Sequence, residues 1–158
     1  MSEVFDLKKF FKGFGYAARG LAGAVRDERN MRIHTCMVFY VIIAGIITKI
    51  SRGEWFAVLL CCALVLGMET MNTAVENLCD ALHPEKSRKI GFVKDAAAGA
   101  VLVCAIFSAI IGCAVFFKTE SLENVKKFAC EHTAMTIIIA CTVVPAIMFI
   151  HGRKKNDN

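Results

Sequence analysis

Charge and proline are both scarce in this chain of 158 residues. Charged residues make up 21% of it, against about 25% in soluble domains, and hydrophobic residues make up 56%, against roughly 45–50%. One small soluble core cannot bury so many apolar residues, which argues against a soluble enzyme. Two prolines and 11 glycines also exclude collagen-like and linker-rich classes. The expected class is a membrane protein with several helices.

The eight cysteines lack the arrangement of a disulfide framework. They form no CxxC pair and show no regular spacing. Most of them lie inside apolar stretches, where a reduced cysteine behaves as a small hydrophobic residue. We therefore expect free thiols rather than a cross-linked scaffold.

The hydrophobic residues are gathered in four stretches of membrane-spanning length. A bilayer core about 30 Å thick needs roughly 20 helical residues at about 1.5 Å each. The four candidate spans are residues 33–50, 55–80, 96–117 and 133–150. Pro145 in the last one is tolerated because neighbouring helices can satisfy the freed carbonyl. We expect an all-α integral membrane protein with three core transmembrane helices and a fourth one at the C-terminus.

An amphipathic segment precedes the first span. Apolar residues recur there at gaps of four and three, the period of one helix face: Leu7, Phe11, Phe14, Ala18, Leu21 and Val25. Lysines and arginines fall outside this stripe. The pattern predicts a surface helix lying in the membrane interface, or one packed on a partner subunit, and the two are compatible.

The lysines and arginines predict the orientation of the spans. Seven lie before the first span, four lie between the second and third, and three lie in the tail, whereas five lie on the opposite side. Positively charged connections stay in the cytoplasm, so we expect both termini and the central loop there. Because these residues flank apolar stretches, lipid headgroups explain them and we expect no nucleic-acid partner.

The second span carries a polar stripe. Glu69, Asn72, Glu76 and Asp80 stand at i, i+3, i+7 and i+11, on one face of a helix. Glu69 lies about 16 Å deeper than Asp80 at 1.5 Å per residue, where an ionisable group is costly and usually functional. Three neighbouring carboxylates with no His or Cys on the stripe favour Mg²⁺. The structural alternative is hydrogen bonding between helices or chains.

Charged segments flank this stripe on the same side of the membrane, at residues 26–34 and 86–95. Phosphoryl transfer from a metal-bound nucleotide needs a carboxylate for the metal, a cation for the developing charge and a carboxylate beside the attacking hydroxyl. The arrangement therefore indicates a kinase. Taken by themselves, the cations of the loop could instead serve only to set the orientation of the spans in the membrane.

Two strings resemble the prokaryotic diacylglycerol kinase family. These are ETMNTAVENLCD at residues 69–80 and KDAAAGAVL at residues 94–102. The string RNMRIH at residues 29–34 is more similar to the undecaprenol kinase branch of Gram-positive bacteria. The resemblance covers roughly residues 10–117. It implies a homotrimeric kinase of the bacterial cytoplasmic membrane that transfers phosphate from ATP to a lipid.

The resemblance also implies roles for individual residues. Glu69 would be the general base for the lipid hydroxyl, with Asn72 beside it, and Glu28 and Glu76 would hold Mg²⁺ with the ATP phosphates. Four further residues would contact the nucleotide: Lys94 at a phosphate, and Asp80, Asp95 and Tyr16.

The C-terminal part departs from the short members of the family. We expect a kinase core at residues 1–119, followed at 120–158 by an extracytoplasmic loop, an extra helix and a basic cytoplasmic tail. The extra helix would pack outside the core or anchor the trimer. The expected reaction is phosphorylation of undecaprenol, with diacylglycerol as the alternative lipid. A cation- or proton-coupled transporter is the alternative from another class, because acidic stripes also pass cations.

Overall fold

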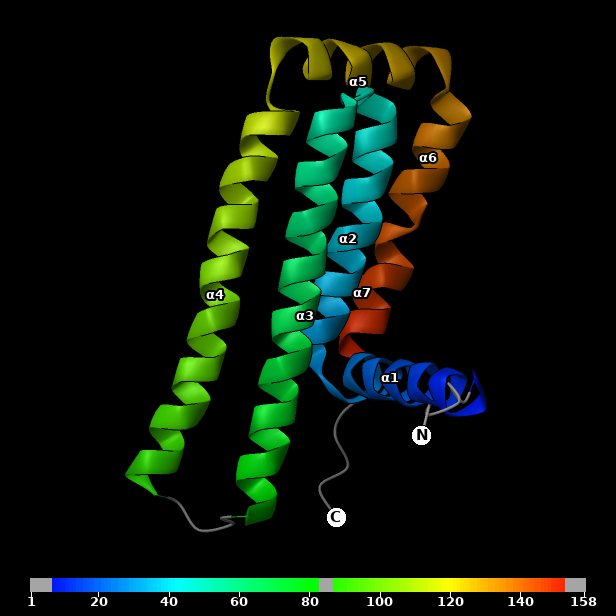
Figure 1. The fold of residues 1–158 in the computed structure, drawn as a ribbon. Helices are drawn as coiled ribbons and strands as arrows, with labels where there is room; N and C mark the ends of the chain where they lie inside the picture. Colours follow the sequence, from blue (N-terminus) through cyan, green and yellow to red (C-terminus); the bar gives the residue numbers. More distant parts are fainter. Residues whose placement is uncertain (1–6, 83–86, 153–158) are drawn as a thin grey trace, which may run out of the picture.

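The computed structural model of the chain describes residues 7–82 and 87–152, and all secondary structure within them is helical (Figure 1). Counting α6 and α7 as one, four helices are long and apolar enough to cross a membrane. The predicted all-α fold is confirmed. Lys86, the basic residues Arg153, Lys154 and Lys155, and the side chains of residues 7–9 lie outside the description. The helices are α1 (Leu7–Asp27), α2 (Arg29–Thr48), α3 (Arg52–Leu82), α4 (Arg88–Phe116), α5 (Thr119–Glu131), α6 (Thr133–Cys141) and α7 (Val143–His151).

Three helices form the body of the molecule, and the others cover its ends and one side. α3 packs along α4, and α2 packs against both. α1 lies across the bundle where α2 begins, and α3 and α4 continue past it (Figure 1). α5 lies across the opposite end, while α6 and α7 run back along α2 (Figure 1). Within the described ranges, α6 and α7 make no close backbone contact with α3 or α4. We call the two ends of the bundle the α1 end and the α5 end.

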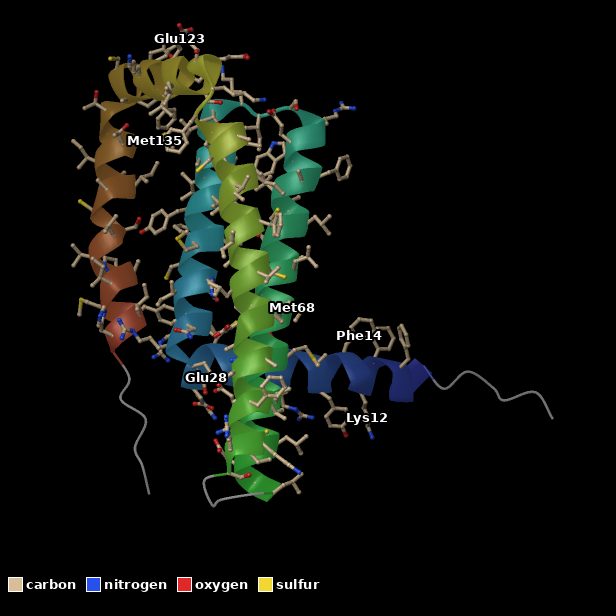
Figure 2. The ribbon with its side chains drawn as sticks, turned by 90° about the vertical axis from the view of Figure 1, so that its left-hand side faces the viewer. Lys12, Phe14, Glu28, Met68, Glu123 and Met135 are labelled. Carbon is tan, nitrogen blue, oxygen red and sulfur yellow. The ribbon has the colours of Figure 1, made fainter. Side chains whose placement is uncertain are left out.

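Helix α1 separates its apolar and basic side chains. Phe14 points toward the α5 end, and Lys12 points away from it (Figure 2). Phe11 and Phe14 are 66% and 62% exposed, which is unusual for large apolar side chains in water. An amphipathic helix across the spans, with its phenylalanines on the membrane side, fits the interface between lipid and water. The arrangement supports the predicted surface helix.

A tight turn joins α2 to α3. Lys49 ends α2 in the left-handed conformation, with φ 55° and ψ 43°. Ser51 and Glu54 form a capping box at the start of α3: the Ser51 N–H donates to Glu54 Oε2 at 2.8 Å, and the Glu54 N–H donates to Ser51 Oγ at 3.4 Å. Gly45 packs against the Trp55 ring, where an added Cβ would lie 2.7 Å from Cη2. These contacts hold the two helices in one register.

The connection after α4 is a helix, although the sequence suggested a loop. The Ser121 hydroxyl donates to the Val115 carbonyl at 3.2 Å, and Asn124 Nδ2 donates to the Thr48 carbonyl at 3.0 Å. Both acceptors belong to the last turns of α4 and α2, whose carbonyls lack partners within the helix. α5 therefore covers the ends of two spans. Its mostly polar composition contains no long apolar run, which is why it was missed.

The fourth span is divided at Thr142. Pro145 lacks the N–H that would donate to the Cys141 carbonyl, and its ring crowds that carbonyl. α6 accordingly ends at Cys141, and α7 begins two residues later. The Thr142 hydroxyl and the Tyr40 hydroxyl of α2 share a hydrogen bond of 3.1 Å. The break is therefore fixed to the bundle at mid-helix.

Candidate active site

The polar stripe of α3 becomes more exposed toward the end of the helix. Glu69, Asn72 and Thr73 are buried, with 3%, 7% and 8% of their surface exposed. Glu76 is half-buried one turn further on, and Asp80 is exposed. The predicted stripe is thus a continuous path from the protein interior to the surface, with its deepest carboxylate at Glu69.

The start of α2 supplies the other wall of the site. Glu28 lies between α1 and α2 in an extended conformation, with φ −102° and ψ 127°. It is close enough to act electrostatically on Glu69, as is Glu76. Asn30 is also near enough to influence the Glu69 carboxylate. The structure therefore brings together three carboxylates that the sequence analysis selected, and we call Glu28, Glu69 and Glu76 the acidic cluster.

Asn72 lies between two members of this cluster along α3. Its Nδ2 donates to Glu76 Oε1 at 3.0 Å. Its Oδ1 is the one buried side-chain nitrogen or oxygen without a hydrogen-bond partner among residues 7–82 and 87–152. A buried acceptor without a donor costs about 1–3 kcal/mol, and such groups often serve a ligand. Asn72 thus positions Glu76 with one end of its amide and offers a free oxygen with the other.

The donor set fits Mg²⁺ bound together with a nucleotide. In the part of the chain that the structure describes, no three Asp, Glu, His or Cys side chains gather closely enough to hold a metal ion. Mg²⁺ does not require such a cage, because it usually keeps several waters and binds one or two carboxylates plus the substrate phosphates. Glu28 and Glu76 supply two carboxylates, and the free Asn72 oxygen is a third ligand of the kind that Mg²⁺ prefers.

The four residues expected at the nucleotide are only partly brought together. Lys94 of α4 is ion-paired with Asp80 of α3, which places a cation near the exposed end of the stripe. Asp95 is exposed and forms no hydrogen bond or ion pair among the described residues. Tyr16 is 63% exposed on α1, where the Arg19 guanidinium lies 4.7 Å from its ring centroid. Along α1, it is about 18 Å from Glu28 at 1.5 Å per residue.

Sequence reasoning missed the burial of Arg32. The residue is 4% exposed, and its guanidinium donates to the Arg26 carbonyl at 2.8 Å and to the Ile150 carbonyl at 3.4 Å. Arg29 Nη2 lies 3.5 Å from His151 Nε2. Arg26 itself is paired with Asp27, and that carboxylate raises the pKa of the Arg26 guanidinium. The signal in the sequence was the density of arginines next to Glu28, which was used to predict orientation and phosphoryl transfer but not burial.

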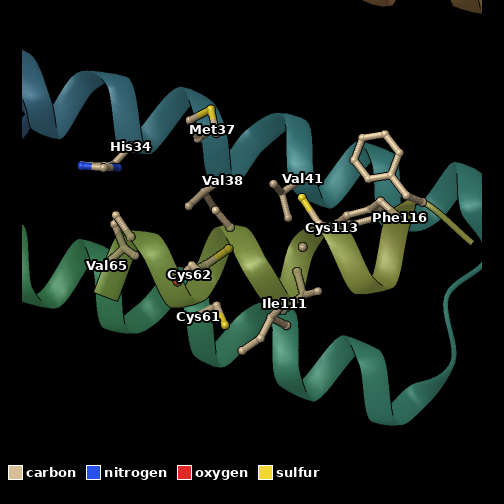
Figure 3. A pocket seen from close by; sticks show the side chains of 16 residues that line it. His34, Met37, Val38, Val41, Cys61, Cys62, Val65, Ile111, Cys113 and Phe116 are labelled. Carbon is tan, nitrogen blue, oxygen red and sulfur yellow. The ribbon is translucent and has the colours of Figure 1, made fainter. Parts of the chain in front are cut away.

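An apolar groove lies on the α5 side of the acidic cluster. It runs between α2, α3 and α4 and has a volume of about 350 Å³ (Figure 3). His34 and Val65 line one end of it, and Phe116 and Phe117 line the other. Val65 precedes Glu69 by one helical turn, and His34 follows Asn30 by one turn. The buried carboxylate thus separates an apolar groove from a polar, cation-flanked region.

The comparisons with known proteins match the core of this fold. The family model for prokaryotic diacylglycerol kinase matches residues 15–116, which end with α4. Undecaprenol kinase from Bacillus subtilis is 37% identical over 111 residues, covering 70% of this chain and 90% of that protein. Diacylglycerol kinase from Synechocystis is 35% identical over 100 residues, covering 63% of this chain and 57% of that protein.

A more distant relative is diacylglycerol kinase from Pseudomonas aeruginosa, which is 28% identical over 97 residues, covering 61% of this chain and 79% of that protein. No solved structure matches the chain significantly. The matched residues contain all the predicted site residues, whereas α5, α6 and α7 lie outside them. The chain therefore belongs to the prokaryotic diacylglycerol kinase family of multi-pass membrane lipid kinases, which use ATP.

Proposed function

We propose that this protein phosphorylates undecaprenol, forming undecaprenyl phosphate and ADP. The observation that carries the proposal is the position of Glu69, buried between the apolar groove and the polar end of α3. The similarity to an undecaprenol kinase over 90% of that relative supports this lipid over diacylglycerol. In the reaction, the lipid hydroxyl oxygen bonds to the γ-phosphorus while the bond to the ADP oxygen breaks, and the hydroxyl proton passes to Glu69.

Glu69 has the surroundings that a general base needs. It lies at the deepest point of the polar stripe. The hydroxyl of a lipid bound in the groove would meet it at the end of the groove lined by Val65. Asn30 lies near the carboxylate and offers it an amide donor. A positioned base of this kind contributes about 10²–10⁴-fold to a rate.

Glu28 and Glu76 are the proposed Mg²⁺ ligands. These two residues would hold the ion, which would offset the negative charge that develops on the ATP phosphates. Asn72 holds Glu76 through its Nδ2, and its buried Oδ1 has no hydrogen-bond partner among the described residues. We assign Lys94 to a phosphate and Asp80, Asp95 and Tyr16 to the rest of the nucleotide. The pairing of Lys94 with Asp80 supports these assignments for the two residues that form it.

The groove is the proposed site of the lipid tail. Its lining is almost wholly apolar, and its end at His34 and Val65 is one turn from the Asn30–Glu69 pair. A tail that occupies the groove would hold its terminal hydroxyl near Glu69. This path lets a substrate approach from the bilayer without crossing water.

We further propose that the α1 end faces the cytoplasm and that the protein assembles as a homotrimer. The excess of lysine and arginine at this end supports the orientation. Residues 1–119 would form the kinase core and residues 120–158 an accessory part. Chemical crosslinking in membranes tests the assembly, since a trimer predicts bands up to three chains and none larger.

The decisive experiment offers undecaprenol and diacylglycerol side by side in mixed micelles with labelled ATP. The Glu69→Gln variant serves as the blank. Label in undecaprenyl phosphate supports the proposal, whereas label mainly in phosphatidic acid reassigns the substrate to diacylglycerol. No label in either lipid would overturn the proposed reaction and favour a cation pathway.

A further inference from the structure

The end of α7 contacts the start of α2 through polar groups. The Ile150 carbonyl accepts from Arg32 Nε at 3.4 Å, and the His151 imidazole lies 3.5 Å from Arg29 Nη2. These contacts join segments about 120 residues apart in the sequence. They lie at the α1 end of the bundle, where Figure 2 labels Glu28.

Electrostatics explains why these partners meet. Arg29 and Arg32 lie in the first turn of α2, where the partial positive charge of the helix N-terminus disfavours cations. α7 runs antiparallel to α2, so its C-terminus brings carbonyls without helical partners and a partial negative charge to the same place. His151 Nδ1 lies 3.0 Å from the Ile147 carbonyl. With a proton on Nδ1, its Nε2 is left to accept from Arg29.

Arg32 also holds the backbone two residues before Glu28. Arg32 Nη1 donates to the Arg26 carbonyl at 2.8 Å, so one guanidinium connects α7 to the end of α1. The segment between these two residues contains Glu28 and Asn30. Its backbone is held in addition by the Glu28 N–H, which donates to the Ala24 carbonyl at 2.9 Å. Arg32 therefore links α7 to the segment that contains Glu28 and Asn30.

We propose that His151 and the α7 C-terminus are positioning elements for the kinase reaction. They hold Arg29 and Arg32, and through them they keep Glu28 and Asn30 beside Glu69. The proposal rests on the proposed function, because it takes Glu28 as a ligand of Mg²⁺. It gives a role to the helix that lies outside the region shared with the family model.

The first test compares His151→Ala with His151→Gln in the full-length protein. Ala removes the acceptor for Arg29, whereas the Gln amide offers both a donor and an acceptor. We expect Ala to raise the KM for MgATP and the half-saturating Mg²⁺ concentration about three- to tenfold, with the KM for lipid unchanged. Gln should restore most of the loss. Met148→Ala is the matched control, because Met148 is exposed one turn earlier in the same helix.

A second variant moves the Ile150 carbonyl, because no side-chain substitution can remove a backbone group. One alanine inserted between Met148 and Phe149 rotates Ile150 and His151 by about 100° around the helix axis. It should reproduce the kinetic loss of His151→Ala or exceed it. One alanine inserted after Gly152 is the control, since it follows both contacts. If the first insertion prevents folding, the comparison of His151→Ala with His151→Gln still tests the proposal.

Hydrogen exchange separates this proposal from the proposed function. The amides of residues 26–32 should exchange faster in His151→Ala and in the first insertion, but not in His151→Gln or the controls. This readout needs no lipid, so it remains valid if the parent protein phosphorylates neither lipid and the proposed function fails. Unchanged exchange in all variants would overturn the proposal. Faster exchange with unchanged MgATP kinetics would overturn it too, because the segment would then loosen without consequence.

Discussion

Helix α3 and the pair α6–α7 are both apolar enough to span a membrane, yet they differ in what they bury. α3 buries a carboxylate, an amide and a hydroxyl at Glu69, Asn72 and Thr73. Among the described residues, α6 and α7 bury no side chain at all. Hydropathy is therefore a poor guide to the role of a spanning helix. The polar groups that a helix buries away from both lipid and water are a better guide to its role, because their burial needs compensation.

The comparison predicts that transfer depends most strongly on Glu69. Glu69→Gln keeps the shape of the side chain but cannot accept the hydroxyl proton, so transfer should fall at least about 10²-fold while ATP binding is nearly unchanged. Labelled ATP with lipid in mixed micelles measures the rate. Glu54→Gln is the matched control, since Glu54 lies at the opposite end of α3 beside Lys118. Retention of more than about a tenth of the parent rate would remove Glu69 from the role of base.

The next largest effect is expected at Glu76. Glu76→Gln removes a proposed Mg²⁺ ligand and should weaken Mg²⁺-dependent ATP binding about tenfold, with a smaller effect when Mg²⁺ is in excess. A titration of nucleotide binding against Mg²⁺ measures this. Asp80→Asn, one turn further along the same face, should leave the Mg²⁺ midpoint in place. A Glu76→Gln midpoint identical to that of the parent would contradict the assignment.

The groove gives a more moderate prediction. Ala109 of α4 lines it, and Ala109→Phe should fill part of the space and raise the KM for undecaprenol about three- to tenfold without changing that for MgATP. Ala114→Phe introduces the same ring on α4 outside the groove lining and serves as the control. Equal lipid kinetics in both variants would show that the tail binds elsewhere.

The smallest effect belongs to the contact between α2 and the middle of the fourth span. Tyr40→Phe removes the hydrogen bond to Thr142, which should lower the free energy of unfolding by about 0.6 kcal/mol, the average for such bonds within membranes. Phosphate transfer should not change, because the contact lies away from the acidic cluster. Thermal unfolding in detergent and the transfer assay together test both parts. Loss of phosphate transfer in Tyr40→Phe would indicate that α6 and α7 position the site along their whole length, not only at the α7 C-terminus.

Most of the fold could be predicted because its signals are local. Each span has its own apolar run, and the period of α1 repeats within 21 residues. α5 escaped prediction because its anchors are non-local: Asn124 donates to the carbonyl of a residue 76 positions earlier. No pattern within residues 119–131 shows that such an acceptor exists.

The candidate site divides in the same way. The stripe from Glu69 to Asp80 follows from helical spacing alone, and the structure retains it on one face with its deepest member buried. The convergence of Glu28 on Glu69 rested on resemblance, since two segments 41 residues apart have no shared period. Arg32 could not be identified as buried, because one of its acceptors lies 118 residues away.

The contact between Gly45 and Trp55 has a consequence for the far end of the bundle. Gly45 follows Asn30 by 15 residues, and Glu69 follows Trp55 by 14. At about 1.5 Å per residue, the two lengths are about 22 and 21 Å, so antiparallel helices that touch at Gly45 and Trp55 bring Asn30 level with Glu69. The contact at the turn therefore sets the axial alignment of α2 and α3. A residue inserted in α3 between Trp55 and Glu69 would shift Glu69 relative to Asn30. The alignment of the site thus depends on a contact near the opposite face of the membrane.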